Sequence, residues 1–163
     1  KVQEANEKWS DIKTKNPNIK LHMLGKLQTN KVKLALRIFD YIHSVDSVKL
    51  ANKISEEQKK NNKKLKLFIQ INIGDEKQKS GVDKDNLINF YNYCKKLNLD
   101  VIGLMCIPPV GNDPVKYFKI MCDLRNLINL EELSMGMSSD YIKATKNSST
   151  YLRIGTGIFG KRI

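Results

Sequence analysis

One segment, LKLFIQINI at residues 65–73, constrains the fold more than any other part of the chain. Only Lys66, Gln70 and Asn72 interrupt its apolar residues, and a short, nearly continuous apolar run is typical of a strand that is buried on both faces. Strands of this kind occur in parallel sheets, whose connecting helices cover the sheet. The segment therefore predicts a parallel sheet with helices packed against it.

The rest of the chain alternates between strand-like and helix-like patterns, which indicates an α/β protein built from βαβ units. Six strands are predicted, at residues 21–25, 41–45, 65–73, 101–107, 132–136 and 150–155. Helices are predicted at 2–15, 28–39, 48–58, 83–97, 113–129 and 138–146. Asp46-Ser47 is the expected N-cap of the third helix, and a Lys/Asn-rich turn follows that helix.

Two architectures suit this alternation, an open doubly wound sheet and a parallel (β/α)8 barrel of the TIM type. Neither a GxGxxG nor a Walker motif follows the first predicted strand, so the usual nucleotide-binding reason for a doubly wound sheet is absent. A complete barrel has eight strands and typically about 250 residues. We therefore expect residues 1–163 to form a single barrel domain that is incomplete at its N-terminal end, with about six of the eight strands.

The formal net charge of +12 raises the question of an anionic partner. The basic residues are mostly lysines and are dense only in KKNNKKLK at 59–66 and at Lys95-Lys96. Arginines interleaved with aromatic residues, which a nucleic-acid stacking platform needs, are missing. A solvated basic surface is therefore favoured, and an RNA-associated module stays an alternative.

Cysteine spacing and hydropathy indicate the expected compartment. Cys94, Cys106 and Cys122 are odd in number and lack the spacing of a disulfide framework or a zinc site. The longest apolar run is far shorter than the ~20 residues of a membrane-spanning helix. We expect a cytoplasmic protein that binds neither a metal nor a membrane.

Two segments at the ends of the last two predicted strands are candidates for an anion site, because barrel enzymes bind ligands at the C-terminal ends of their strands. MGMSSD at 135–140 places two serines after a glycine, and its Asp140 can cap the next helix. RIGTGIFG at 153–160 carries Gly155 and Gly157, which let backbone N–H groups approach a ligand closely. Together these segments predict an anion cradle.

Arg153 is the sharpest single candidate. Leu152 and Ile154 flank it in the predicted strand, so alternation points the Arg153 side chain to the opposite face, toward the barrel interior. A buried guanidinium must be paired or bound to a ligand, and an internal salt bridge remains the other interpretation. His22 and His43 are interpreted as core or rim histidines. No Ser/His/Asp triad, paired carboxylates or HExxH motif is present, which leaves hydrolase hypotheses without support.

Six blocks of sequence resemble, in order, the pyridoxal-phosphate homeostasis proteins, whose fold is similar to the N-terminal barrel of alanine racemase. The blocks are VQEANEK (2–8), GKLQTNKVK (25–33), HSVDSVKLANKIS (43–55), LFIQINIGDEKQKSGV (67–82), GLMCIPP (103–109) and LSMGMSSDYIKATKNSSTYLRIGTGIFGKR (133–162). The resemblance implies a cytoplasmic binder of pyridoxal 5'-phosphate that acts in vitamin B6 homeostasis without robust catalysis. Apo-enzymes that receive the cofactor are the implied protein partners. The alternative is a racemase-like enzyme that uses the same cofactor.

The resemblance also implies roles for individual residues. Arg153 would face the pyridine nitrogen, while Ser138, Gly155 and Thr156 would hold the phosphate, and no residue of this chain would be catalytic. Because arginine keeps its proton, it cannot donate one to the ring, and the cofactor stays a weaker electron sink than beside a carboxylic acid. This property suits storage better than carbanion chemistry.

The chain departs from the family pattern in three respects. The Schiff-base lysine of the family belongs to a segment expected upstream of residue 1, and none of the lysines present can be assigned that role. Leu21 stands where the family usually has Trp, and Lys26 where His or Gln is frequent, which affects the ring-side pocket. The family is monomeric, and a barrel short of two strands would expose strand edges that favour a dimer.

Overall fold

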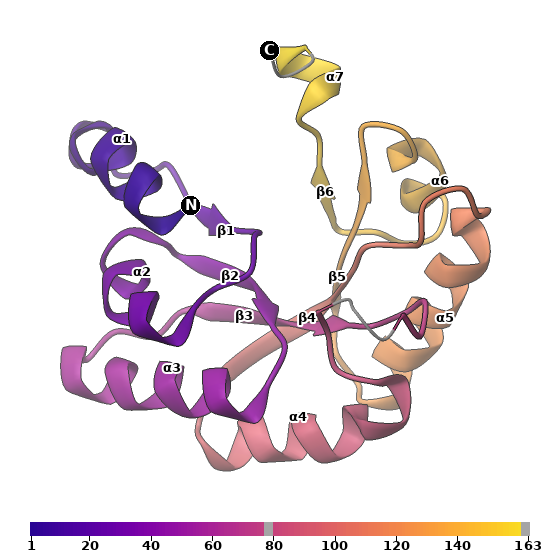
Figure 1. Ribbon diagram of the computed structural model, residues 1–163, viewed down its shortest axis with the longest axis horizontal. Helices are drawn as coiled ribbons and strands as arrows, with labels where there is room; N and C mark the ends of the chain where they lie inside the picture. Colours follow the sequence, from indigo (N-terminus) through magenta and orange to yellow (C-terminus); the bar gives the residue numbers. More distant parts are fainter. Residues whose placement is uncertain (77–79, 161–163) are drawn as a thin grey trace.

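The computed structural model describes residues 1–76 and 80–160 and shows six parallel strands with helices between them (Figure 1). The strands are β1 (His22–Met23), β2 (Tyr41–Val45), β3 (Lys66–Ile71), β4 (Asp100–Cys106), β5 (Glu132–Met137) and β6 (Tyr151–Arg153). The α-helices are α1 (Val2–Lys15), α2 (Val32–Ile38), α3 (Val48–Asn61), α4 (Leu87–Lys96), α5 (Pro114–Leu127), α6 (Tyr141–Thr145) and α7 (Thr156–Phe159). The predicted parallel α/β class is confirmed.

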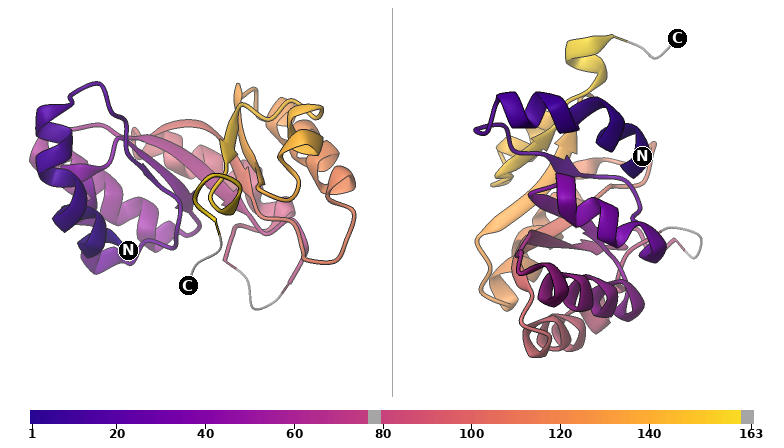
Figure 2. Two further views of the ribbon diagram at one scale, coloured as in Figure 1. Left: turned by 90° about the horizontal axis from the view of Figure 1, so that it is seen from above. Right: turned by 90° about the vertical axis from the view of Figure 1, so that its left-hand side faces the viewer.

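The strands follow one another across the sheet in chain order, from β1 to β6. A doubly wound sheet needs a point at which the strand order reverses, so the open doubly wound alternative is wrong. The sheet curls into a half-barrel whose helices lie on the outer face (Figures 1 and 2). The curl brings β6 back toward β1, since the ring centroids of Tyr151 and His22 lie 5.8 Å apart. An inner face is thereby enclosed on which side chains from both ends of the sheet meet.

The central strand β3 is buried on both faces, as its apolar run predicts. Leu67 and Ile69 are fully buried in the core shared with the outer helices. Phe68 points to the inner face, where its ring stacks on His43 with centroids 4.1 Å apart. The sheet therefore has an apolar outer face and an inner face that mixes aromatic and polar groups.

Several elements differ in extent from their sequence predictions. The first and last strands shorten from 21–25 and 150–155 to two and three residues, because each is paired on one side alone and the curl bends the ends of the sheet. The helices predicted at 28–39 and 83–97 begin with 3-10 turns, Thr29–Lys31 and Lys84–Asn86. Helix α7 forms where only a turn was expected. Residues 77–79 and 161–163 lie outside the described residues.

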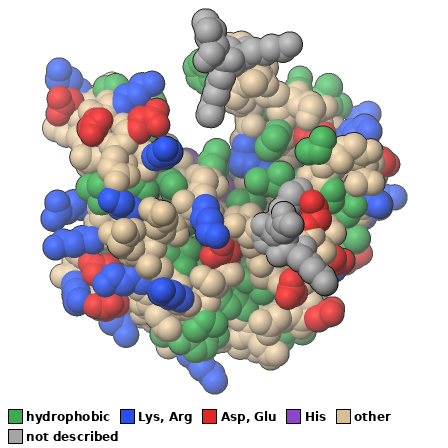
Figure 3. Space-filling model, in the orientation of Figure 1, with side chains coloured by type: hydrophobic (Ala, Val, Ile, Leu, Met, Phe, Trp, Pro, Cys, Tyr) green, Lys and Arg blue, Asp and Glu red, His purple; other side chains and the backbone are tan. Residues whose placement is uncertain are grey.

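The surface of the molecule shows where the basic side chains lie and where it is hollowed. Lys and Arg side chains are spread over the outer helices, and a hollow opens between the half that carries α1 and β1 and the segment that carries β6 and α7 (Figure 3). No helix of the described residues is long and apolar enough to cross a membrane. In the orientation of Figure 1, this hollow lies between β1 and β6, on the side where the half-barrel is open.

Candidate functional site

Arg153 ends β6 and turns its guanidinium into the inner face of the half-barrel. Its Nη1 donates to Ser134 Oγ at 2.9 Å, and its Nη2 donates to the carbonyl oxygen of Cys106 at 2.8 Å. No Asp or Glu of the described residues forms an ion pair with it, so the alternative of an internal salt bridge finds no support there. A guanidinium carries five N–H groups, and these two bonds fix its plane while leaving further donors for a ligand.

A chain of polar groups extends from Arg153 along the inner face. Ser134 Oγ lies 2.8 Å from Nδ1 of the buried His43, and His43 Nε2 lies 3.0 Å from Nδ1 of His22. Burial lowers the pKa of His43 to about 3, with the neighbouring His22 and the Arg153 charge as further causes. Burial lowers the pKa of His22 as well. Both imidazole rings are therefore neutral at neutral pH. Among the four hydrogen-bonded groups Arg153, Ser134, His43 and His22, only the guanidinium carries a charge.

Aromatic rings line the same inner face. The Tyr151 ring lies 5.2 Å from the ring of Phe68 and 5.7 Å from that of His43, in edge-to-face geometry. The Tyr41 ring stacks on His22 at 4.1 Å. Burial, together with Tyr41, raises the pKa of Tyr151 to about 12, so this phenol stays neutral. The inner face next to Arg153 is thus lined by aromatic rings that carry no charge.

The two glycine-containing loops meet beside Arg153 through Ser138. Ser138 Oγ accepts hydrogen bonds from the backbone N–H groups of Gly155, at 3.2 Å, and Gly157, at 3.1 Å. A hydroxyl has two acceptor sites and one proton, so two accepted bonds leave its proton for an acceptor in the cavity. The arrangement therefore presents a hydrogen-bond donor to an incoming anion.

The loop that carries Ser138 is fixed by its backbone. Gly136 has a φ of +91°, and a Cβ there would lie 2.5 Å from Ala144 Cβ, so only glycine fits this position. Asp140 is the N-cap residue of α6, but its Oδ1 accepts from the Met137 N–H at 2.6 Å instead of from a helix N–H. The predicted capping role of Asp140 is therefore wrong in detail: the carboxylate closes the loop instead.

Two neighbouring cavities, of about 600 Å³ and about 420 Å³, share Arg153 and Gly155 in their walls. Ser138 and Thr156 line the larger cavity, whereas His22, His43 and Tyr151 line the smaller one. The Thr156 hydroxyl has no hydrogen-bond partner among the described residues, and a Cβ on Gly155 would meet no heavy atom within 4 Å. All four residues predicted from the sequence therefore line the larger cavity.

This space fits a phosphorylated pyridine. Unused donors of Arg153 suit a ring nitrogen that accepts a hydrogen bond, and the donors of Ser138 and Thr156 suit a phosphate, for which an uncrowded Gly155 leaves room. Within the described residues, no group of three His, Cys, Asp or Glu side chains could hold a metal ion.

Sequence reasoning named four residues that line the larger cavity but not the residues that support Arg153. It did not identify Ser134 as the partner of Arg153, nor Tyr151 as one of the aromatic rings that line the inner face. The available signal was register: parallel pairing places Ser134 opposite Tyr151, so the two side chains share the inner face with Arg153 two residues further on. His43 was correctly interpreted as a core histidine, but its hydrogen bond to Ser134 was not anticipated.

Comparisons with known proteins agree with this geometry. The family model for the alanine racemase N-terminal domain matches residues 1–162. A pyridoxal phosphate homeostasis protein of Aquifex aeolicus is 38% identical over 99% of this chain and 75% of its own length, and one of Homo sapiens is 37% identical over 99% of this chain and 66% of its own.

Solved structures show the same relationship. PipY of Synechococcus elongatus PCC7942, solved with pyridoxal phosphate bound, superposes with a TM-score of 0.86 at 34% identity, over 98% of this chain and 79% of that one. An alanine racemase of Clostridium difficile 630 shares the fold, with a TM-score of 0.70 at 16% identity over 93% of this chain and 42% of that one. The chain therefore belongs to the pyridoxal phosphate homeostasis proteins, a group with the alanine racemase N-terminal domain.

Proposed function

We propose that this protein binds pyridoxal 5'-phosphate and acts in cofactor homeostasis without robust catalysis of its own. The observation that carries the proposal is the placement of Arg153, which two hydrogen bonds hold in the wall shared by both cavities. The names of the curated relatives and the cofactor bound to PipY support the same ligand.

Each residue has a definite task in this proposal. Arg153 donates a hydrogen bond to the ring nitrogen and keeps its own proton, so the ring nitrogen is not protonated. The hydroxyl groups of Ser138 and Thr156 hold the phosphate, and Gly155, which has no side chain, leaves room for it. When bound, the cofactor supplies an aldehyde and an electron-withdrawing ring, and an unprotonated ring is the weaker electron sink. The arrangement favours retention of the cofactor over chemistry at an amino-acid carbon.

The resemblance carries further expectations, which stay predictions. They are a closed barrel of eight strands, a Schiff-base lysine outside residues 1–163, a cytoplasmic location and delivery of the cofactor to apo-enzymes. The proposal above rests on none of them, because the contacts of Arg153 and Ser138 lie within the described residues.

Phosphorus NMR of the cofactor phosphate tests the proposal directly. Titration of the chain with pyridoxal 5'-phosphate is expected to shift and broaden the phosphate resonance, whereas Arg153→Gln and Ser138→Ala each weaken binding roughly tenfold or more, because a charge-assisted hydrogen bond is lost. Arg37→Gln on the exposed face of α2 removes the same charge elsewhere and is the matched control. Equal binding by all four proteins would overturn the proposal.

A second assay separates a binder from an enzyme. Amino acids incubated with the cofactor-loaded protein in deuterated water are expected to retain their α-proton at the rate that the free cofactor gives. Exchange well above that rate, abolished by Arg153→Gln, would support the racemase-like alternative.

A further inference from the structure

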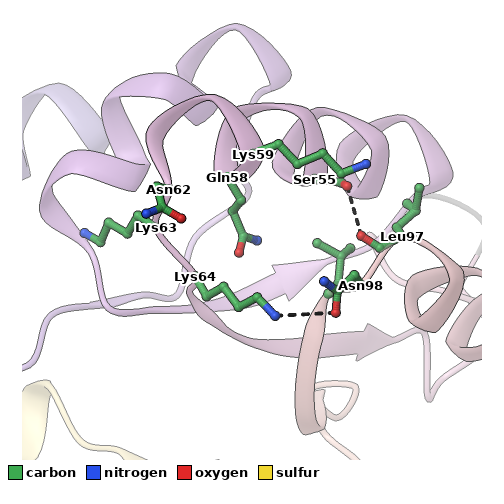
Figure 4. A pocket seen from close by; sticks show the side chains of 9 residues that line it. Ser55, Gln58, Lys59, Asn62, Lys63, Lys64, Leu97 and Asn98 are labelled. Atoms are coloured by element: carbon green, nitrogen blue, oxygen red, sulfur yellow. Dashed lines mark hydrogen bonds between the residues drawn. The ribbon is translucent and has the colours of Figure 1, made fainter.

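The dense lysine cluster KKNNKKLK at 59–66 borders a cavity at the opposite end of the sheet from the cofactor site, and the turn at Leu97–Leu99 closes the cavity from the other side (Figure 4). The cavity has a volume of about 310 Å³ and lies between the C-terminal ends of α3 and α4, where β3 and β4 begin. Lys64 Nζ donates to Asn98 Oδ1 at 3.4 Å, and Ser55 Oγ donates to the Leu97 carbonyl at 3.0 Å. The tertiary fold thus joins segments more than 30 residues apart into one basic wall.

Gln58 projects from α3 into this wall with an unused donor. Its side chain is 7% exposed, and its Oε1 accepts from the Leu65 N–H at 3.3 Å. That bond fixes the orientation of the Gln58 amide, because in the flipped orientation its NH2 group would face the Leu65 N–H, donor against donor. Nε2 is consequently left buried without a hydrogen-bond partner. A buried donor without an acceptor is costly, and an acceptor from a ligand would relieve that cost.

The lysines of the wall are not needed to cap the helices. Neither Lys59 nor Lys64 donates to a helix carbonyl among the described residues, and backbone N–H groups serve carbonyls in the last turns of both helices: Asn62 donates to Gln58, Leu97 to Tyr93 and Leu99 to Cys94. Lys63 is committed elsewhere, since its Nζ donates to the carbonyls of Leu36 and Phe39 at the end of α2.

Two ammonium groups are therefore available to a ligand. Lys59 has no hydrogen bond or ion pair with any described residue, and Lys64 has only its long bond to Asn98. None of the residues that line the cavity is acidic. The nearby carboxylates are occupied, because Glu57 pairs with Lys53 at 2.9 Å and Glu56 pairs with Lys53 and Lys60.

We propose that this cavity is a second anion site, which takes a small phosphate-bearing molecule between Lys59, Lys64 and the Nε2 donor of Gln58. Two free ammonium groups match the double charge of a phosphate, and the cavity has room for a small organic group besides. Nε2 is shielded from solvent, so the ligand displaces a side chain of the rim to reach it. The Lys64–Asn98 hydrogen bond, at 3.4 Å, is the longest at this cavity, and it is the bond that breaks when the ligand enters.

Nitrogen–proton correlation NMR with inorganic phosphate as the probe tests the proposal, because the Gln58 side-chain amide gives its own pair of resonances. Phosphate is expected to shift that pair saturably, whereas chloride at equal ionic strength does not. Lys59→Met and Lys64→Met, which change exposed side chains and do not threaten folding, are each expected to weaken the response roughly tenfold. Lys119→Met on α5 removes the same charge from an exposed position away from the cavity and is the matched control.

Gln58→Glu provides the sharpest variant. The carboxylate keeps the acceptor for Leu65 but replaces the free donor with a negative oxygen, so phosphate binding is expected to be abolished. Backbone resonances of Leu97 and Asn98 report phosphate binding in this variant. Ser138→Ala, which affects only the cofactor phosphate site, leaves the response at Gln58 unchanged, so failure of one site is distinguishable from failure of the other.

Three results would overturn the proposed site. They are Gln58 side-chain amide resonances that phosphate does not shift, a loss of phosphate binding in Lys119→Met as large as in Lys64→Met, or a chemical-shift change that never saturates with phosphate. Tight, strongly salt-dependent binding of an RNA oligonucleotide that Lys59→Met abolishes, without saturable phosphate binding, would replace the small-molecule site with a nucleic-acid surface.

Discussion

Ser134 Oγ lies 2.9 Å from Nη1 of Arg153 and 2.8 Å from Nδ1 of His43, so a single hydroxyl joins the guanidinium proposed to face the cofactor to a buried neutral imidazole. Ser134 is itself fully buried on β5, while Arg153 ends β6 and His43 lies in β2. The position of Arg153 is thus fixed from across the half-barrel and not by its own strand alone. Four predictions follow from this support and from the loops beside it.

Ser134→Ala is expected to lower both stability and cofactor affinity. The free energy of unfolding should fall by about 1–3 kcal/mol, because a guanidinium N–H and His43 Nδ1 lose their shared partner in a buried place. Affinity for pyridoxal 5'-phosphate should fall roughly tenfold, since Arg153 keeps only its bond to the Cys106 carbonyl. Urea denaturation and cofactor titration measure the two effects.

Ser55→Ala is the control for the loss of a serine hydroxyl. Ser55 is buried and donates to Leu97 far from the cofactor site, so its removal should cost stability without changing cofactor affinity. Equal loss of affinity in the two variants would show that Ser134 acts through general stability and not through Arg153.

Gly155→Ala is expected to fold normally and bind the cofactor poorly. Gly155 has a negative φ, and the new Cβ would meet no protein atom within 4 Å, so the unfolding temperature should stay unchanged. The same methyl group would occupy the space assigned to the phosphate and weaken binding of pyridoxal 5'-phosphate by roughly tenfold. Pyridoxal, which lacks the phosphate, should bind equally to both proteins; a uniform loss for both ligands would contradict the assignment.

Gly136→Ala is expected to destabilise the loop that presents Ser138. The positive φ and the 2.5 Å approach to Ala144 should together lower the free energy of unfolding by about 1–3 kcal/mol or more. Thermal unfolding followed by circular dichroism measures the change. Gly25→Ala, where the nearest atom is Met23 Cε at 3.9 Å, is the control and should have little effect. Similar unfolding curves for both variants would refute the argument.

His43 is expected to make the protein less stable as the pH falls. In the unfolded chain its imidazole binds a proton near pH 6.5, whereas in the folded chain it does so only near pH 3. Between these values the unfolded state binds more protons, so the free energy of unfolding falls by about 1.4 kcal/mol for each pH unit below 6.5. Above pH 6.5 both states are neutral and the effect vanishes.

The measurement is urea denaturation of the native protein and His43→Phe between pH 7 and pH 4. The variant keeps an aromatic ring against Phe68 but has no proton to bind, so its stability should fall less steeply. His22 contributes with the same sign in both proteins. Parallel curves would show that His43 binds a proton as readily in the folded state as in the unfolded state and would contradict the prediction.

Some features could be predicted from the local sequence pattern, because residues close together in the chain determine them. The apolar run at 65–73 predicted a doubly buried parallel strand, which β3 confirms with fully buried Leu67, Phe68 and Ile69. Ser47 was placed correctly at the start of α3, where its hydroxyl accepts from the Leu50 N–H. Alternation around Arg153 predicted the face to which its side chain turns. In each case backbone periodicity or a cap within a few residues decides the outcome.

Other features depend on contacts between segments far apart in the chain. The partner of Arg153 is 19 residues away, and Cys106 is 47 residues away, so no local pattern could identify them. Asp140 was expected to cap a helix, but the loop geometry offered its carboxylate the Met137 N–H instead. The sequence favoured a solvated surface for the lysines at 59–66, whereas the fold places Lys59 and Lys64 at a cavity beside the unpartnered Gln58 donor.

The sequence by itself determined the strand and helix order and the parallel class of the sheet, because periodicity acts over a few residues. It also indicated the direction of Arg153 and the two glycine-containing segments, while the cofactor-binding roles of the four site residues are what the resemblance to the family implies. Only the tertiary structure decided how Arg153 is held, how Ser138 gathers two backbone N–H groups and where the second cavity lies. The physical reason is the curl of the sheet: it brings side chains of β2, β5 and β6 within hydrogen-bond distance, and chain order does not encode that distance.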